Sequence, residues 1–328
     1  MDVSVALCTY NGNEYLRSQL ESILTQTREP DEIVIYDDGS TDQTRSLLSS
    51  YARDYPSLID LHFNEENLGP TRNFERAIGS CSGDVIAVSD QDDVWRDNKL
   101  EEQLAAFNDQ EASLIYHNSV VASESLTPET TLWDSLSPPY QLDNRNQLSQ
   151  FESLVRRNYV QGASMLFDAA LRNHCLPIPE YWNYDHWIAA IAACRGGIHG
   201  LDKQLLIYRQ HENQAIGVTQ SSFPRRVLGS LVSTDVQYRE SVTQWTALST
   251  AIEQMDTSEM CIEKDVALRA VESRIRYEES RVIIHNGKSR PALHHFIRNL
   301  RDGGYQQFGD HWAVAGRDLL ELLVGAIL

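Results

Sequence analysis

An acidic cluster closely follows an apolar segment that predicts a buried strand. Asp90, Gln91, Asp92 and Asp93 come after the run DVIAV at residues 84–88. Carboxylates that face one point repel each other unless a cation lies between them. Their hard oxygen atoms suit Mg²⁺ or Mn²⁺, which bind through one or two carboxylates together with substrate phosphates. A solvated acidic turn with a helix-capping aspartate is the ordinary alternative for so common a pattern, but the position after a buried strand favours a metal site.

Two other polar clusters also end predicted strands. The sequence TYNG at residues 9–12 follows a strand expected at 3–7, and DDGS at 37–40 follows a strand expected at 32–36. Each cluster by itself is ordinary turn chemistry, because Asp, Asn, Ser and Gly are the usual turn residues. Three clusters that end strands of one parallel sheet meet at one edge, where open α/β sheets bind their ligands. The sequence therefore predicts a polar pocket with several carboxylates.

The elements that must position these clusters alternate along the first half of the chain. We expect strands at 3–7, 32–36, 59–63, 84–88 and 114–117, and amphipathic helices at 14–24, 41–51, 70–78 and 97–107. Short apolar runs indicate the strands, and apolar residues at helical spacing indicate the helices. This alternation predicts an α/β fold with a mainly parallel central sheet covered by helices.

The second half of the chain has a weaker pattern. Residues 123–150 are rich in Ser, Pro, Thr and Asn and predict a loop region. We expect a strand or a pair of strands at 158–167, a helix at 184–195 and short strands at 198–201 and 205–208. From about residue 223 the pattern is helical to the end. We therefore expect one domain at 1–220 and a helical C-terminal region at 221–328.

Composition and charge restrict the partners. The chain has 47 acidic and 28 basic residues and a formal charge of −19. Such a surface repels nucleic acid and anionic lipid, so an anionic nucleotide would need a local divalent cation, an Arg or a helix N-terminus. Five widely spaced cysteines and no signal peptide predict a cytoplasmic protein. The apolar C-terminal stretch LLELLVGAIL indicates either a packed helix end or a contact with a membrane or partner.

Several stretches, in order and spacing, carry a family resemblance. SVALCTYNG, IVIYDDGSTDQT, ENLGPTRNF and SDQDDVW resemble the family 2 glycosyltransferases, and GASMLF, LPIP, YDHWIAA and YRQHENQAIG resemble their rhamnosyltransferase-like branch. The resemblance covers roughly residues 1–217. It implies the GT-A fold of nucleotide-diphospho-sugar transferases, followed by a C-terminal helical extension.

The resemblance also implies roles for individual side chains. Those expected at the nucleotide are Thr9, Asn11 and Glu14 near the base and ribose, Asp38 on the base, Arg72 at the base or phosphates, Asp90 at the ribose, and Asp93 in support. Asp92 would ligate Mn²⁺ or Mg²⁺, and His211 would complete the metal shell or touch the diphosphate. A surface arginine and a structural histidine are the ordinary alternatives for Arg72 and His211.

Asp185 is the candidate catalytic base. It precedes His186 and Trp187 at the start of an expected apolar helix, where related enzymes carry an acid usually followed by two aromatic residues. His186 departs from that pattern and puts the contact with the acceptor in doubt. Burial beside Trp182 and Trp187 would raise the pKa of Asp185 toward the working range of a general base. The alternative is that Asp185 caps the helix.

Together with the resemblance, these residues imply an inverting, metal-dependent transfer of a sugar from a nucleotide-sugar donor to a glycan or lipid-linked acceptor in cell-surface polysaccharide synthesis. The branch resemblance suggests dTDP-rhamnose as the donor, with a UDP-hexose as the alternative. The expected location is the cytoplasm, at the inner face of the membrane. A nucleotidyltransferase would instead need a Gly-rich phosphate loop with a basic residue after the first strand, where this chain has TYNGN. A non-catalytic sugar-nucleotide-binding protein is the other alternative, and it would not need the full set of acids at positions 38, 90, 92, 93 and 185. The sequence leaves the oligomeric state open.

Overall fold

The computed structural model describes residues 1–136, 140–211, 235–286, 290–309 and 312–327. The chain divides into two compact units. The first comprises the described parts of Met1–Gln150, Asn158–Ile178 and Trp182–Val218, and the second the described parts of Phe151–Arg157, Pro179–Tyr181 and Thr219–Leu328. The predicted boundary near residue 220 lies outside the described residues.

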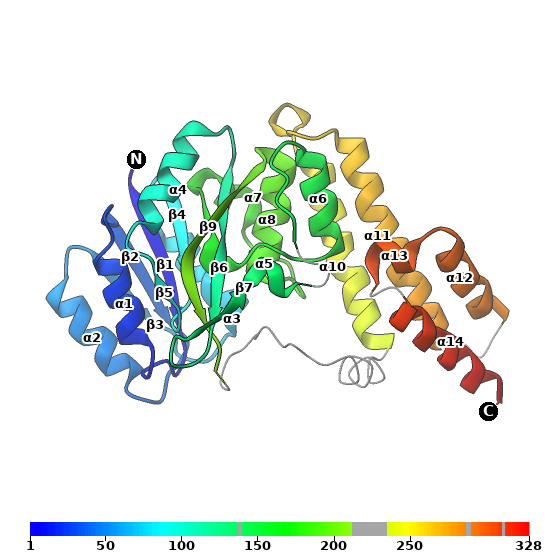
Figure 1. The fold of residues 1–328 in the computed structure, drawn as a ribbon, viewed down its shortest axis with the longest axis horizontal. Coiled ribbons are helices and arrows are strands. Elements are labelled where there is room, and N and C mark those ends of the chain that lie inside the picture. Colours follow the sequence, from blue (N-terminus) through cyan, green and yellow to red (C-terminus); the bar gives the residue numbers. More distant parts are fainter. Residues whose placement is uncertain (137–139, 212–234, 287–289, 310–311, 328) are drawn as a thin grey trace. The chain divides into compact units, whose positions relative to one another are not determined.

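The first unit is built on a parallel core of four strands. These are β1 (Val3–Thr9), β2 (Glu32–Asp37), β3 (Ile59–Phe63) and β4 (Val85–Ser89), in the order β3-β2-β1-β4 (Figure 1). The helices along them are α1 (Leu16–Leu24), α2 (Thr44–Asp54), α3 (Pro70–Ser80) and α4 (Lys99–Asp109). Every residue of β1 and β4 is buried, because a parallel sheet is covered on both faces. In register, Leu7 of β1 lies between Ile35 of β2 and Ser89 of β4, so all three strands end at the same edge.

Beyond β4 the sheet becomes mixed. The strands here are β5 (Val94–Trp95), β6 (Leu114–Ala122), β7 (Pro128–Thr131), β8 (Leu166–Asp168) and β9 (Ile198–Arg209). The order continues β4-β8-β6-β9-β5, with β8 antiparallel to β4 and β9 parallel to β6. Strand β9 runs the length of β6 and ends beside the residues that follow β4 (Figure 1). The predicted α/β architecture is confirmed.

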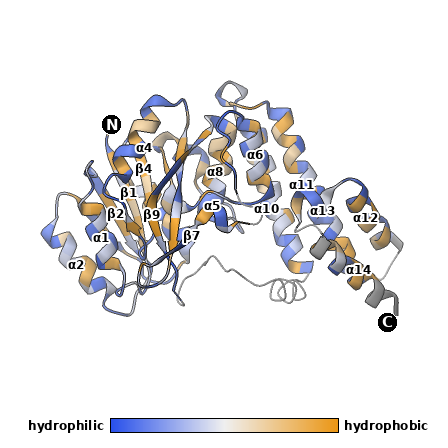
Figure 2. Ribbon diagram, viewed as in Figure 1, coloured by the Kyte–Doolittle hydropathy of each residue, from blue (hydrophilic) through white to orange (hydrophobic). Residues whose placement is uncertain are grey.

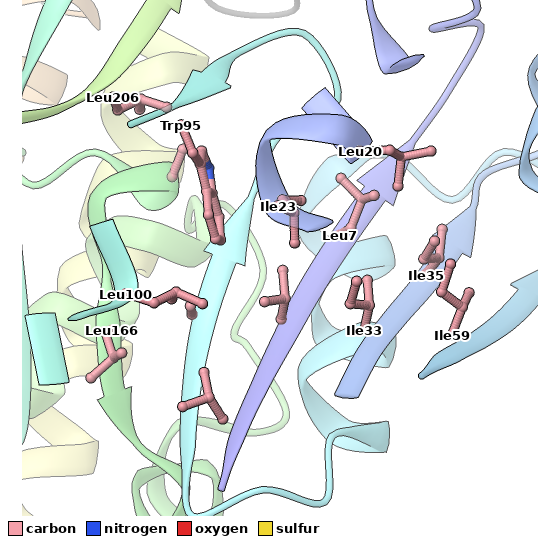
Figure 3. Close-up of a cluster of buried hydrophobic side chains, with 14 of the residues drawn as sticks. Leu7, Leu20, Ile23, Ile33, Ile35, Ile59, Trp95, Leu100, Leu166 and Leu206 are labelled. Carbon is pink, nitrogen blue, oxygen red and sulfur yellow. The ribbon is translucent and has the colours of Figure 1, made fainter. Parts of the chain in front are cut away.

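One hydrophobic core joins the two halves of this sheet. Figure 3 shows Leu7, Ile33 and Ile35 from the parallel strands in the same cluster as Trp95 and Leu166 from the mixed part. In Figure 2 the strands β1 and β4 are mostly hydrophobic, whereas α1 and α2 alternate hydrophobic and hydrophilic residues. The continuous core holds the strand ends that carry the polar clusters in fixed relative positions.

Three expectations for residues 123–208 were wrong in detail. The expected loop at 123–150 contains β7, α5 (Leu132–Ser135) and the start of α6 (Gln147–Arg156). The expected strand at 158–167 is mainly irregular, with a 3₁₀ turn η1 (Gly162–Ser164) before β8, and the two short strands at 198–208 form the single strand β9. Strands β7, β8 and β9 form where they pair with β6, and this tertiary contact is not visible as a local pattern in the sequence. The remaining elements of this region are η2 (Ala169–Leu171), α7 (Arg172–Cys175) and α8 (Tyr184–Arg195).

The second unit is helical, as predicted. It contains α10 (Asp235–Gln254), η3 (Thr257–Glu259), α11 (Lys264–Asn286), α12 (Arg290–Arg301), α13 (Gly304–Phe308) and α14 (Trp312–Ile327). Tyr277, Ile284, Phe296 and Tyr305 form the centre of a small core between these helices. Within the described part of the chain, no helix is long and apolar enough to cross a bilayer.

Candidate donor and catalytic site

The carboxyl ends of β1, β2 and β4 border a cavity of about 640 Å³. The predicted site residues that line it are Thr9, Asp38, Asp90, Asp92 and Asp185. The first four come from the ends of the three parallel strands, and Asp185 comes from α8. The structure thus brings together acids from positions 38 to 185, although their individual roles stay predictions.

Asp38 anchors one wall of the cavity. Its side chain is 3 % exposed. Oδ1 accepts hydrogen bonds from the Asn64 side chain at 2.8 Å and from the Leu68 backbone N–H at 2.9 Å. Oδ2 accepts one from the backbone N–H of Gly69, whose φ of 81° suits a glycine. A carboxylate has about four acceptor positions, so one remains on Oδ2 for a ligand.

Asn11 joins the loops after β1 and β2. Its φ is 46°, and its side-chain oxygen accepts a hydrogen bond from the Thr41 N–H at 2.8 Å. Thr9 donates from its hydroxyl to Asp37, which also pairs with Arg45 at 2.7 Å. Among the described residues that line the cavity, Asn11 does not occur. Its observed contacts are those of a residue that shapes the wall.

Another part of the cavity wall is acidic. Asp90, Asp92 and Asp185 all line it, and none of the described residues lining the cavity is Lys or Arg. Burial, followed by the charges of Asp92 and Asp185, raises the pKa of Asp90 well above its usual range. The Tyr184 hydroxyl bonds to Asp90 and opposes that shift. Such a wall favours a bound cation.

Asp92 and His211 form a two-residue donor set. The Nε2 atom of His211 lies 2.9 Å from Oδ2 of Asp92, and the side chains are 6 % and 14 % exposed. Adjacent ligands of an octahedral ion, each about 2.1 Å from the metal, lie about 3 Å apart, so both atoms fit one Mg²⁺ or Mn²⁺. The described residues include no group of three or more His, Cys, Asp or Glu that would hold a metal unaided. The remaining ligands would have to be phosphate oxygens or water.

Arg209 holds the end of β9 against this metal site. Its backbone N–H donates to Oδ1 of Asp93 at 3.3 Å, and its Nε donates to the Asp92 carbonyl at 2.9 Å. The guanidinium also lies over the Tyr15 ring, 4.7 Å from its centroid. The residue Arg209 as a whole is 7 % exposed. Arg209 is therefore buried in structural contacts, and it fixes the strand that brings His211 to Asp92.

Asp93 points into the protein toward a buried lysine that the sequence did not reveal. Asp93 is fully buried, and its Oδ2 has no hydrogen-bond partner among the described residues. Lys99 is also fully buried, with Nζ 3.5 Å from the centroid of the Trp95 ring. Burial lowers the pKa of Lys99 well below its usual range, and the nearby charge of Asp93 opposes this shift. On an amphipathic helix a lysine normally indicates the solvent face, so no local signal identifies Lys99.

Asp185 lies in the first turn of α8, and the N-cap residue of that helix is Asn183. Oδ1 of Asp185 accepts a hydrogen bond from the His186 N–H at 2.6 Å. Burial raises the pKa of Asp185 to about 6, although hydrogen bonds from His186 and the Asn158 side chain lower it. A carboxylate with this pKa is ionised at neutral pH and basic enough to accept a proton.

Arg72 and Glu14 are not brought to this cavity. Arg72 donates to Glu75 at 2.7 Å and to the Ile178 carbonyl at 3.0 Å, and it is not among the described lining residues. A carboxylate three residues away on the same helix holds it there. Glu14 lines a separate cavity of about 460 Å³, together with Tyr15, Glu124 and Arg209.

Gln91 is a wall residue that sequence reasoning passed over. Its side-chain oxygen accepts from the Tyr10 N–H at 2.8 Å, and its side-chain nitrogen donates to the Tyr10 carbonyl at 3.0 Å. This paired contact joins the loop after β1 to the acidic cluster after β4. A glutamine between aspartates has no distinctive pattern, so only the spatial contact reveals it.

Comparison with known proteins identifies the family. The model of glycosyl transferase family 2 matches residues 4–173, which is more than half of the chain. The chain belongs to this family. A protein of Mycobacterium tuberculosis is 29 % identical over 232 residues, which cover 68 % of this chain and 62 % of that protein. The family 2 chain thus spans less than two thirds of the length of that relative.

Two further relatives extend the comparison. The dTDP-rhamnosyl transferase RfbG of Shigella flexneri is 26 % identical to this family 2 chain over 257 residues, covering 73 % of this chain and 82 % of RfbG. The crystal structure of Staphylococcus aureus TarS 1–349 in complex with UDP-GlcNAc superposes with a TM-score of 0.60 at 15 % identity, covering 97 % of this chain and 91 % of that one. The expected GT-A fold is confirmed.

Proposed function

We propose that this chain is an inverting, metal-dependent glycosyltransferase that uses a dTDP- or UDP-sugar. The observation that carries the proposal is that Asp92 and Asp185 line one acidic cavity, which no described Lys or Arg lines, while His211 lies 2.9 Å from Asp92. An anionic donor would enter such a cavity together with a divalent cation. Asp185, the proposed general base, would share this cavity with the donor.

Asp38 and its loop would recognise the base. The acceptor position that remains on Oδ2 suits the N3–H of uracil or thymine, because a carboxylate accepts but does not donate. The contacts from Leu68 and Gly69 hold the carboxylate in place before the nucleotide binds. This preference favours uracil or thymine over cytosine or adenine, whose ring nitrogen at that position is an acceptor.

Asp92 and His211 would hold Mn²⁺ or Mg²⁺. The bound ion would supply positive charge to the leaving nucleoside diphosphate. Asp90 would contact the ribose, and Asp93 would support the loop from the interior. Arg209 would keep the end of β9 in place through its bonds to Asp92 and Asp93.

Asp185 would take the proton from the acceptor hydroxyl as that oxygen attacks the anomeric carbon. Attack on the face opposite the diphosphate inverts the configuration in a single displacement. The pKa of about 6 keeps Asp185 ionised at neutral pH. His186 replaces the first aromatic residue of the related pattern and would give the acceptor side a polar contact instead.

The similarity to RfbG makes dTDP-rhamnose the first donor to test, with UDP-hexoses next. The acceptor would be a glycan or a lipid-linked saccharide in cell-surface polysaccharide synthesis. The reaction would take place in the cytoplasm, at the inner face of the membrane.

The test is donor binding by calorimetry with dTDP-rhamnose, UDP-glucose, UDP-galactose and GDP-mannose, with and without Mn²⁺. We expect metal-dependent binding of a pyrimidine donor by the wild type and its loss in Asp92→Ala. Asp60→Ala is the matched control, because it removes an acid that is 53 % exposed in the same unit and pairs with His62. Binding that is equal with and without metal would contradict the proposal. Tight binding with no transfer to any acceptor extract would favour a non-catalytic binding protein.

A further inference from the structure

Helix α12 in the second unit exposes a row of apolar side chains. Leu293, Ile297 and Leu300 are 51 %, 53 % and 41 % exposed. Their spacing of four and three residues places them on one face of the helix. Phe296, three residues after Leu293 and four before Leu300, lies beside this row and is buried in the core of the unit. The nearby Ala292 is buried as well. The apolar surface of the helix is therefore wider than the part that its own unit covers.

The sequence around this face is basic in an otherwise acidic chain. Residues 281–301 contain no Asp or Glu and five Lys or Arg, namely Arg281, Lys288, Arg290, Arg298 and Arg301, whereas the whole chain has a net charge of −19. Arg281 is used internally in an ion pair with Asp318 at 2.9 Å. Arg298 is part-exposed, and Arg301 is exposed with its side chain at 77 %. Arg301 lies one turn after Ile297 and borders the apolar row, where it also pairs with Asp302 at 2.9 Å. Arg298 lies farther round the helix.

We propose that the exposed face of α12 is a docking surface for an anionic lipid membrane. Apolar side chains flanked by arginines are the pattern of a helix that lies in the membrane interface. The net charge of the chain would repel an anionic bilayer, so attraction requires a local basic surface such as this one. The proposal does not depend on the identity of the sugar donor.

A second copy of the chain fits this face less well. Three half-exposed aliphatic side chains supply a small part of the roughly 800 Å² per partner that a stable interface buries. Symmetric pairing of α12 with itself would also bring together two segments that are both basic, each with Arg290, Arg298 and Arg301 and no Asp or Glu within the helix. A bilayer supplies both the apolar layer and the negative charge.

The experiment is flotation of the full-length protein with vesicles of phosphatidylcholine alone or mixed with phosphatidylglycerol, at low and high salt. We expect binding to the anionic vesicles that weakens with salt. Leu293→Asn/Ile297→Asn should lower the partition coefficient roughly tenfold or more, because it removes two side chains from the apolar row. Arg298→Gln/Arg301→Gln should lower it about thirtyfold, since each of the two charges near an anionic surface contributes about 1 kcal/mol, a factor of about five.

Val236→Asn is the matched control. It removes an apolar side chain that is 53 % exposed on α10 of the same unit, and it should leave binding unchanged. Circular dichroism checks that each variant is folded, and Leu300→Asn is the substitute if the double variant is not. Three results would overturn the proposal: no vesicle binding by the wild type, equal binding to neutral vesicles, or unchanged binding by the apolar variant. If the wild type is a dimer and the apolar variant is a monomer, the exposed face of α12 instead binds a second copy of the chain.

Discussion

The two units differ in the charged partners that surround their buried carboxylates. In the second unit, Asp318 is fully buried and pairs with a cation of the chain. Arg281 pairs with it at 2.9 Å, His285 lies 3.1 Å away, and the Tyr305 hydroxyl donates at 2.7 Å. In the first unit, Asp90, Asp92 and Asp185 line a cavity with no Lys or Arg among its described residues.

A buried charge is costly unless it is paired, so the difference separates structure from function. The second unit supplies its own counter-charges, and Asp318 stabilises the packing of its helices. The first unit keeps several acids together without a full complement of cations, which lowers the stability of the ligand-free protein. The metal that binds with the donor would supply the positive charge that the described residues lining the cavity do not provide.

The largest expected effect is on transfer in Asp185→Asn. Loss of a general base should lower the transfer rate by about 10²–10⁴-fold, while donor binding stays near the wild-type value. The wild-type rate should rise as the pH increases through about 6, because Asp185 must be ionised to accept the proton. The measurement is initial rate against pH under saturating donor, with Asp60→Asn as the control. A variant that transfers at the wild-type rate would remove Asp185 from the mechanism.

The second effect concerns the stability contribution of Asp318, which pairs with Arg281. Asp318→Asn should lower the free energy of unfolding by about 3–5 kcal/mol, because it leaves the buried Arg281 without its counter-charge. Asp92→Asn should change the stability of the ligand-free protein much less, because it relieves repulsion in the acidic wall. Urea denaturation of both variants measures the contrast. Equal losses of stability would mean that the acidic wall is also a structural network.

The third effect is stabilisation by ligand. Mn²⁺ together with UDP should raise the free energy of unfolding of the wild type by about 2.7 kcal/mol at one hundred times the dissociation constant. Chelation by EDTA should reverse the shift, and Asp92→Ala should abolish it. Thermal unfolding with UDP alone, Mn²⁺ alone and both together provides the measurement. An equal shift with UDP alone would exclude the metal from nucleotide binding.

The fourth effect is a difference in pH dependence. Because the folded-state pKa of Asp185 is about 6, above the ordinary value of 3.8, the folded protein holds this proton more strongly than the unfolded chain. The contribution of Asp185 to stability is therefore present at low pH and is lost as the pH rises from about 4 to 6. Asp185→Asn cannot lose a proton, so its stability relative to the wild type should increase over that interval. Urea midpoints at several pH values test this, and a constant difference would argue against the raised pKa.

Local sequence patterns predicted the parallel half of the sheet well. The strand at 59–63 and the helix at 184–195 have the predicted bounds, and β1, β2 and β4 differ by two residues or fewer at each end. Buried parallel strands appear as short apolar runs, and polar residues mark the points where they end. The region 123–208 was predicted less well, because β7, β8 and β9 depend on pairing with β6.

The candidate site shows the same division between local and distant information. The acids at its rim could be listed from the strand ends, and the family resemblance added Asp185 and His211. Nothing in the sequence indicated that Arg72 would bond to the Ile178 carbonyl, 106 positions away, or that Lys99 would lie buried near Asp93. Both outcomes depend on which neighbours the fold supplies.

The sequence by itself determined the α/β fold class, the family and the set of acids at the carboxyl edge, because apolar runs and turn residues act locally. Only the tertiary structure decided which groups lie against these acids. His211 reaches Asp92 across 119 positions of sequence, and Arg209 reaches Asp93 across 116. Electrostatic interactions depend on separation in space and on burial, so the charge balance of the cavity exists only once the distant strand β9 lies beside the end of β4.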